Sequence, residues 1–263
     1  MILKKLEPHV WVFDAVNFDA IESLEEVLND LFANSVLKAE SKLKQILSEY
    51  PDFIDCWVHL AILYERTGRD IESYLANREA YHIGLSALPK EFDWAKDCLD
   101  WGFHENRPFL RACFNLVLQI IDTSMRDEAW HILNNLIHVS PNDNLGARYL
   151  LLKMCLLDKN IEAAEQLFKQ YPDDYSTEFY YGKVLLALMQ NDPVSAQSAL
   201  EQAKLEFPFV LKELKKKRHI QPKGFDGQYI LRGGKEEAYI YWREFGALWQ
   251  QDSENYRFLI GNS

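Results

Sequence analysis

Cysteine is scarce in this sequence, and so are long apolar runs. Four cysteines are spread over 263 residues, and no two of them form a Cys-x-x-Cys pair. Small disulfide-stabilised domains are dense in cysteine, so that class is excluded and a reduced, intracellular protein is indicated. A membrane helix needs roughly 18 consecutive apolar residues, whereas one of the longest clean runs here, 184–189, has only six. Residues 1–8 lack a secretory signal, because charge and proline interrupt them. These absences predict a cytoplasmic protein.

Motifs for catalysis are also missing. The sequence has no phosphate-binding loop, since Gly233-Gly234 is not followed by Gly-Lys-Ser/Thr, and it has neither a Gly-x-Ser-x-Gly nor a His-Glu-x-x-His motif. The seven histidines are dispersed and offer no ligand set for zinc. Cys113 lies within an apolar run, which favours an inert buried thiol. The acidic pair Asp173-Asp174 is interpreted as a solvated face or a helix start. We therefore predict no enzymatic activity, no metal and no cofactor.

Positive charge is in deficit. The sequence has 40 acidic and 29 basic side chains, which gives a formal net charge of -11. Such a chain repels nucleic acid and anionic lipid unless basic residues gather locally. One basic stretch exists, 212–218. It could touch nucleic acid, an acidic lipid surface or an import receptor; alternatively, it is the end of a helix whose dipole it complements. We predict that neither nucleic acid nor membrane is a partner.

What the sequence does contain is a repeat. Five similar segments each contain a small residue, which we call the anchor: Ala39, Ser73, Ala129, Ala163 and Ala196. Successive anchors are 34, 56, 34 and 33 residues apart. The spacing of 56 equals 34 plus an insertion of 22. Four positions after each anchor the residue is usually leucine, in the order Leu43, Asn77, Leu133, Leu167 and Leu200. Twelve positions after three of the anchors comes a proline, which ends a helix: Pro51, Pro141 and Pro208. A period of 34 residues predicts pairs of helices.

The second unit carries the family signature most fully. Trp57, Leu60-Ala61, Tyr64 and Gly68 stand where tetratricopeptide repeats have Trp, Leu-Gly, Tyr and a turn glycine. The sequence resembles this family over residues 20–210. The resemblance implies an all-α fold, a right-handed α-α superhelix of about five helix pairs. We expect three parts: an N-terminal extension (1–19), the solenoid (20–210) with an insertion near 85–107, and a C-terminal capping segment (211–263).

Local signals mark where helices begin. Residues 23–26, Ser-Leu-Glu-Glu, form a capping-box pattern and predict a helix start. Pro108 and Pro193 stand where the first turn of a helix tolerates proline. The insertion contains a short piece that looks helical between two tryptophan-bearing stretches, and we expect it to pack back onto the repeats.

A narrower resemblance rests on three stretches. Residues 105–112, 141–152 and 233–238 are similar to stretches from bacterial tetratricopeptide proteins of the suppressor-of-tumorigenicity-seven type. That group has no assigned chemistry. The resemblance therefore refines the expected fold and adds little about function.

A last helix is predicted over residues 235–250. It places aromatic and aliphatic residues on one face at spacings of three and four. A solenoid needs an atypical terminal unit to cover its last apolar face. The helix is therefore interpreted as a cap; alternatively, it docks a partner or forms the seam of a homodimer.

Resemblance places the binding surface on the first helix of each pair, which lines the concave groove of such solenoids. There, polar and aromatic residues hold a protein segment or peptide. Arginine in a groove favours a carboxylate, because guanidinium binds it through two hydrogen bonds. The alternative is that Arg111 and Arg148 pair internally with acids such as Glu105 or Asp143. The candidate partner-binding residues are Asp55, His59, Arg111, Asn115, Arg148, Tyr149 and Tyr181.

Overall fold

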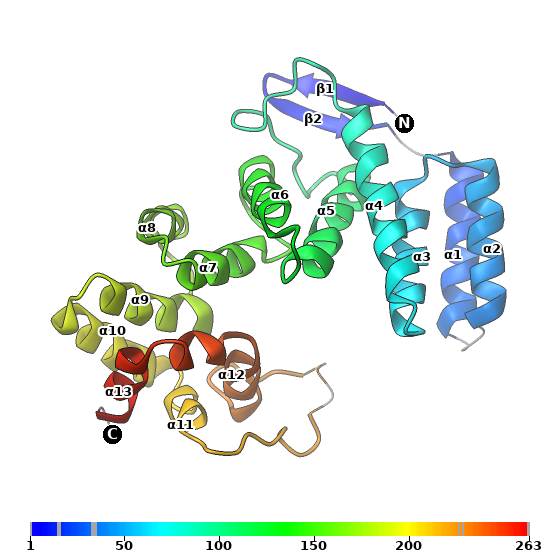
Figure 1. The fold of residues 1–263 in the computed structure, drawn as a ribbon. Coiled ribbons are helices and arrows are strands. Elements are labelled where there is room, and N and C mark those ends of the chain that lie inside the picture. The colour runs from blue at the N-terminus through cyan, green and yellow to red at the C-terminus, as the bar shows by residue number, and fades with distance from the viewer. Residues whose placement is uncertain (1, 15–16, 33–35, 226, 228, 262–263) are drawn as a thin grey trace. The chain divides into compact units, whose positions relative to one another are not determined.

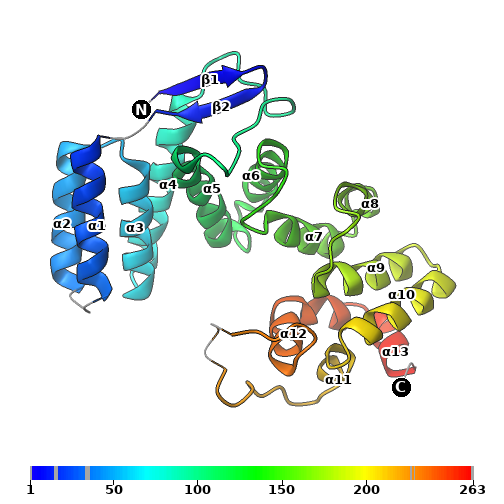
Figure 2. The same ribbon diagram turned by 180° about the vertical axis from the view of Figure 1, so that it is seen from behind.

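The computed structural model describes residues 2–14, 17–32, 36–225, 227 and 229–261. The described part of the chain is mostly helical and falls into two compact units, Met1–Ala147 and Arg148–Ser263 (Figures 1 and 2). Among these residues, no helix combines the length and the apolar content that crossing a bilayer needs.

The first unit contains a two-stranded hairpin and three helix pairs. Its elements are β1 (Leu3–Glu7), β2 (Val10–Phe13), α1 (Phe18–Phe32), α2 (Val36–Glu49), α3 (Ile54–Arg66), α4 (Asp70–Ala87), the short 3-10 helix η1 (His104–Asn106), α5 (Arg107–Ile120) and α6 (Arg126–Val139). Each helix packs against the next one along the chain, and α5 also packs against α3. The small anchor residues let neighbouring helices approach each other closely. Ala39 and Ala129 are fully buried, as the repeat pattern requires.

The N-terminal hairpin and the insertion form one substructure, which the sequence analysis did not foresee. The strands pair antiparallel, with Leu3 opposite Phe13. The insertion lies alongside the hairpin, and the amide of Cys98 donates to the carbonyl of His9 at 2.7 Å. The expected all-α fold is confirmed in its stacked helix pairs, to which this small hairpin is added. The expected helical piece in the insertion is wrong: residues 88–103 have no helix, because their backbone groups form hydrogen bonds with the hairpin and within turns.

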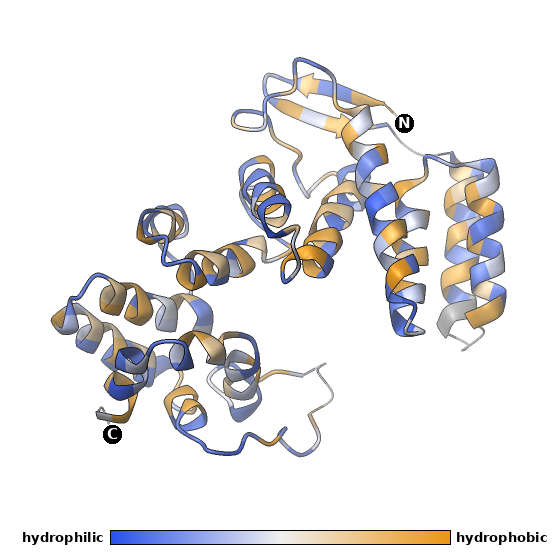
Figure 3. Ribbon diagram, viewed as in Figure 1, coloured by the Kyte–Doolittle hydropathy of each residue, from blue (hydrophilic) through white to orange (hydrophobic). Residues whose placement is uncertain are grey.

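The second unit holds two further helix pairs and the C-terminal helices. These are α7 (Ala147–Leu157), α8 (Ile161–Gln170), α9 (Thr177–Met189), α10 (Pro193–Glu206), α11 (Val210–Leu214), α12 (Lys235–Gln250) and α13 (Ser253–Gly261). The five predicted pairs are thus α1/α2 to α9/α10. Helix α12 packs against α9, α11 and α13. Hydrophobic and hydrophilic residues alternate along the helices (Figure 3), as expected where one face of each is buried.

The helix-start signals are confirmed in part. Pro108 and Pro193 lie in the first turns of α5 and α10. The capping box at Ser23 is wrong: α1 begins five residues earlier, at Phe18, because Asn17 already caps it and accepts a hydrogen bond from the Asp19 amide at 2.8 Å. Ser23 lies inside the helix and donates to the Asp19 carbonyl.

Candidate protein-binding surfaces

Three candidate residues of the first unit meet between α3 and α5. The Arg111 guanidinium lies 2.6 Å from a carboxylate oxygen of Asp55, and the His59 ring nitrogen lies 3.8 Å from the same oxygen. Asp55 and His59 are four residues apart on α3, so their side chains leave one face of that helix. The contact between α3 and α5 brings Arg111 beside them. All three side chains keep between 22% and 34% of their surface exposed.

The charges around His59 determine its protonation. Burial lowers its pKa most; Asp55 opposes this, and Arg111 and Arg66 lower it further. His59 is therefore neutral at neutral pH and can both donate and accept a hydrogen bond. Arg66 is exposed and is an addition to the candidate set. It escaped sequence analysis because only the folded chain shows that its charge acts on His59. Asn115 lies one helical turn beyond Arg111. Its side-chain amide is half-buried and has no hydrogen bond within the described part of the chain.

Two candidate residues of the second unit, Arg148 and Tyr149, lie together beside Asp174. Arg148 Nε donates to Asp174 Oδ2 at 2.6 Å, and its guanidinium lies 4.2 Å from the centre of the Tyr149 ring. The Tyr149 hydroxyl donates to the same carboxylate oxygen at 3.3 Å. Burial works to raise the pKa of Asp174, but hydrogen bonds from Ser176 and Arg148 outweigh it, so the pKa is lowered. Asp174 stays ionised and holds Arg148 in place.

These pairs answer the question left open about the arginines. Both arginines do pair internally: Arg111 pairs with Asp55, and Arg148 pairs with Asp174. Asp143 accepts a hydrogen bond from the amide that begins α7. A solvated face is wrong for Asp174, since only 4% of its side chain is exposed. A helix start is right, since its carboxylate accepts a hydrogen bond from the amide of Ser176, the residue that caps α9.

Tyr181 does not belong to a binding surface. Its side chain is fully buried, and its hydroxyl donates to the Phe207 carbonyl at 3.4 Å. The ring packs on Tyr241 and Trp249 of α12, with centroids 5.3 and 6.2 Å away. The sequence pattern could not separate this residue from Tyr149, because the packing of α12 on α9 covers one tyrosine and leaves the other half-exposed.

The aromatic face of α12 is also covered. Tyr241 and Trp249 are each 1% exposed, and the Trp249 indole N–H donates to the Tyr241 hydroxyl at 3.0 Å. Burial raises the pKa of Tyr241 well above its ordinary value. The capping interpretation fits this face. A dimer seam on it does not, because its atoms are already packed inside the unit.

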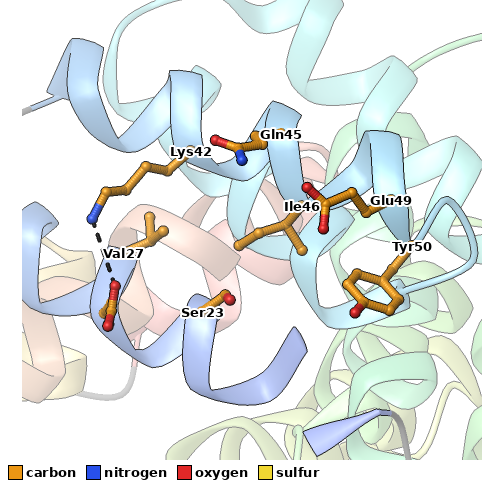
Figure 4. A pocket seen from close by; sticks show the side chains of 8 residues that line it. Ser23, Val27, Lys42, Gln45, Ile46, Glu49 and Tyr50 are labelled. Atoms are coloured by element: carbon orange, nitrogen blue, oxygen red, sulfur yellow. Dashed lines mark ion pairs between the residues drawn. The ribbon is translucent and has the colours of Figure 1, made fainter. Parts of the chain in front are cut away.

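A hollow of about 200 Å³ lies between α1 and α2. Figure 4 shows Ile46 in its middle, with Lys42 on one side and Glu49 and Tyr50 on the other. Lys42 also faces Glu26 at 3.9 Å. Most of the side chains that line this hollow are polar, and Lys42 and Glu26 pair across it.

A second hollow, of about 460 Å³, lies among α8, α9 and α10. Phe168, Leu186 and Ala187 supply its apolar lining. The Lys183 ammonium reaches over the Phe168 and Tyr180 rings, 5.9 Å from each centroid. The side chains that line the two hollows pack against neighbouring helices or form ion pairs.

The thiols are buried within the helix pairs. Cys56, Cys113 and Cys155 are buried, as predicted for Cys113, and Cys98 is partly exposed. Burial raises the pKa of Cys56 and of Cys155 to about 12 and raises that of Cys113 as well. Thiolates are thus disfavoured at all three sites. No group of three or more metal-binding side chains occurs among the described residues.

Comparisons with solved structures identify the fold. A tetratricopeptide repeat protein from Parabacteroides merdae is 14% identical, with a TM-score of 0.55 over 94% of this chain and 81% of that chain. The nearly identical TPR-like repeats described for a Podosopora anserina kinesin light chain are 13% identical over 73% of this chain and 96% of theirs, with a TM-score of 0.47. PilF of Pseudomonas aeruginosa is 14% identical over 73% of this chain and 94% of its own, with a TM-score of 0.40. Only the first likeness is close enough to carry an argument, and it shows the tetratricopeptide-like fold of stacked helix pairs.

Comparison with sequences identifies the family. No curated protein matches the chain significantly. Nothing in these comparisons supports the narrower resemblance to suppressor-of-tumorigenicity-seven proteins, since the family that matches is a different one. The profile of the family described as transcriptional repressor TCF25 matches residues 22–255, nearly the whole chain. The chain therefore belongs to the Tcf25 family.

Proposed function

We propose that this protein is a non-catalytic interaction module that binds a segment of a partner protein on the α3/α5 face. The observation that carries the proposal is the cluster of Asp55, His59 and Arg111, with Arg66 and the unbonded Asn115 amide nearby. The charges that act on the neutral His59 are those of two arginines and one aspartate. A single carboxylate from a partner balances that charge and finds guanidinium donors already in place.

The family and the fold support this direction. Stacked helix pairs present side chains from successive first helices on a continuous surface, which suits an extended segment or a helix of a partner. Because the family is described as one of transcriptional repressors, we place the partner in a complex that regulates transcription. An intracellular, cytoplasmic or nuclear, setting is part of this proposal.

A charge swap tests the site without losing its ion pair. In the double variant Asp55→Arg, Arg111→Asp the pair is kept but the arginine moves to α3. If the partner's carboxylate binds Arg111, capture of partners from cell extract falls about tenfold or more, since a misplaced charge in such a site costs 2 kcal/mol or more. Capture at the wild-type level would overturn the assignment of the site.

A matched control comes from a second ion pair of the same unit. Arg78 lies 2.7 Å from Glu128, and both side chains are exposed to a similar extent as the first pair. The swap Arg78→Glu, Glu128→Arg joins α4 to α6 and leaves the α3/α5 face untouched. It should retain full capture.

Arg148 and Tyr149 are proposed as the equivalent contact of the second unit. Arg148 is too well held by Asp174 for charge reversal to be informative, because an unpaired buried Asp174 would unfold the site. Tyr149→Phe is the milder change: it removes the hydroxyl and keeps the ring under Arg148. Partner capture that falls threefold or more, with unchanged stability, would support the contact.

A further inference from the structure

Positive charge is concentrated in one part of the second unit. The first unit has 24 acidic and 13 basic side chains, and the second has 16 of each. Within residues 212–223, which we call the basic segment, six side chains are basic and only Glu213 is acidic. Figure 3 shows the hydrophilic run that follows α11. Such local excess creates a positive potential on an otherwise neutral or acidic surface.

The helix dipole does not explain the basic segment. Helix α11 ends at Leu214, so residues 216–218 lie beyond it. Lys216 pairs with the carboxylate of Glu213, which is 5% exposed. Lys217, Arg218 and Lys223 are exposed and make no ion pair or hydrogen bond within the described part of the chain. Three cations are therefore left for an external group.

Further lysines come from the helices on either side of the basic segment, α11 and α12. Lys212 and Lys235 both reach over the ring of Phe209, at 5.5 and 5.7 Å. The pKa of Lys215 is lowered by burial and then by the charge of Lys204. Lys204 itself lies 3.5 Å from a carboxylate oxygen of Glu201.

The basic segment is held in place at its middle. The His219 ring stacks on Trp242 of α12, with centroids 3.7 Å apart and ring planes 7° apart. Its Nδ1 lies 3.1 Å from the Glu213 carboxylate. Only 10% of the His219 side chain is exposed. The basic residues on either side of His219 are therefore connected to a position that packing holds fixed.

Apolar side chains are exposed beside these cations along the chain. Ile220 follows His219 directly and is 64% exposed; Tyr229 and Leu231 are 91% and 72% exposed. The next residue, Arg232, is fixed again, by a 2.9 Å ion pair to Glu206 and by the carbonyl of Tyr175. Large apolar groups left in water between two anchored points are typical of an interaction surface.

We propose that the basic segment is a second docking surface, and that its occupant is an acidic protein segment with apolar side chains. The cations bind the carboxylates, and Ile220 and Leu231 bind the apolar groups. A sequence-independent nucleic-acid site stacks bases on several aromatic rings. Here Tyr229 is largely exposed, whereas Phe209 and Phe225 are only partly exposed and Trp242 covers His219. A lipid surface would extend over the acidic remainder of the unit, while a short peptide meets only the basic segment.

A peptide-binding assay tests this docking surface. The probe is a fluorescein-labelled peptide of about 14 residues in which two glutamates alternate with one leucine, read by fluorescence anisotropy on the full chain. We expect saturable binding that weakens as salt is raised, because carboxylates and cations are screened. The triple variant Lys217→Glu, Arg218→Glu, Lys223→Glu should weaken it about tenfold or more. The double variant Tyr229→Ser, Leu231→Ser should weaken it severalfold.

Control variants separate this surface from net charge. The triple variant Lys90→Glu, Lys169→Glu, Arg257→Glu changes the net charge equally at exposed places elsewhere, and it should bind the probe as the wild type does. Equal loss in this control would overturn the proposal, because net charge alone would then account for binding.

Comparison probes separate the classes of ligand. A single-stranded oligothymidylate of about 14 nucleotides and vesicles with about 30% phosphatidylserine offer the same sign of charge. Tighter binding of either one than of the peptide would overturn the choice of a protein segment. The charge swap at Asp55 and Arg111 should leave peptide binding unchanged, so failure of the α3/α5 site and failure of the basic segment can be told apart.

Discussion

At the scale of single residues, Gly84 is the tightest point between two helices. A Cβ placed on Gly84 would lie 2.0 Å from a ring carbon of Phe109, which is fully buried. Alanine usually favours a helix over glycine by about 1 kcal/mol, but the overlap forces α4 away from α5. We expect Gly84→Ala to lower the free energy of unfolding by about 2 kcal/mol, as measured by urea denaturation.

Gly261 is the control for that substitution. A Cβ there meets open space, so Gly261→Ala should change stability by less than about 0.5 kcal/mol. A neutral or stabilising Gly84→Ala would show that the ring of Phe109 can move aside.

Asn106 is the buried polar residue that joins β2 to the insertion. Its side chain accepts from the Phe13 amide at 3.1 Å and donates to the carbonyls of Trp11 and Asp100 at 3.0 and 3.2 Å. None of its surface is exposed. Asn106→Ala leaves buried backbone groups without partners and should cost about 2–4 kcal/mol in urea denaturation. Asn134→Ala, which removes one bond within α6, should cost less than half as much; equal costs would contradict the special role of Asn106.

His59 reports the charges of the α3/α5 face. Its pKa is lowered by burial and by Arg111 and is raised by Asp55. In an NMR titration, Arg111→Gln should raise the pKa of His59 and Asp55→Asn should lower it. Because the folded pKa lies below the unfolded one, the contribution of His59 to stability is present above the unfolded pKa near 6.5 and is lost as pH falls below it. Shifts of the same sign in both variants would contradict this arrangement of charges.

At the scale of elements, the hairpin and the insertion depend on each other. The Cys98 amide donates to His9 of the hairpin turn, whereas the next amide, Leu99, donates to Val139 of α6 at 2.8 Å. Deleting residues 2–14 should therefore speed hydrogen exchange at Cys98 by orders of magnitude. The Leu99 amide should change much less. Protection that persists at Cys98 would mean that the insertion folds without the hairpin.

The helix pairs could be predicted from the sequence, and the hairpin could not. Helices of the repeat are encoded by contacts between residues close in sequence, such as small anchors and prolines 12 positions apart, so a period of 34 residues is visible directly. The register of Leu3 against Phe13 and the bond from Cys98 to His9 are fixed by partners that folding alone brings together. Short strands without a clear alternation give little signal of their own.

The candidate site, like the fold, could be predicted only in part from the sequence. Residue type and repeat position identified Asp55, His59 and Arg111, which the structure does bring together. Position alone could not show that Tyr181 is covered by α12 or that Asp174 is buried beneath Arg148, because both depend on helices packing from elsewhere in the chain.

At the scale of the whole molecule, the first unit accounts for the net negative charge of the chain. The first unit has 24 acidic and 13 basic side chains, whereas the second has equal numbers of both. Raising NaCl from about 0.05 to 0.5 M shortens the screening length from over 10 Å to about 4 Å. Hydrogen exchange should then slow more in α1–α6 than in α9–α12, because self-repulsion in the first unit is relieved. Faster exchange in α1–α6 would mean that salt weakens its ion pairs more than its repulsion.

The burial of the thiols has a practical consequence for spectroscopy. Cys56, Cys113 and Cys155 are enclosed by helix packing, and burial raises the pKa of each. Thiol-directed spin labels at neutral pH should therefore not react with these three cysteines. Replacing Cys98 with serine would then give a protein that takes up no label. Cysteines introduced at two exposed sites, one in each unit, would then take up one label apiece. Such a doubly labelled chain would report, by pulsed electron resonance, how the distance between its two units responds when a partner binds.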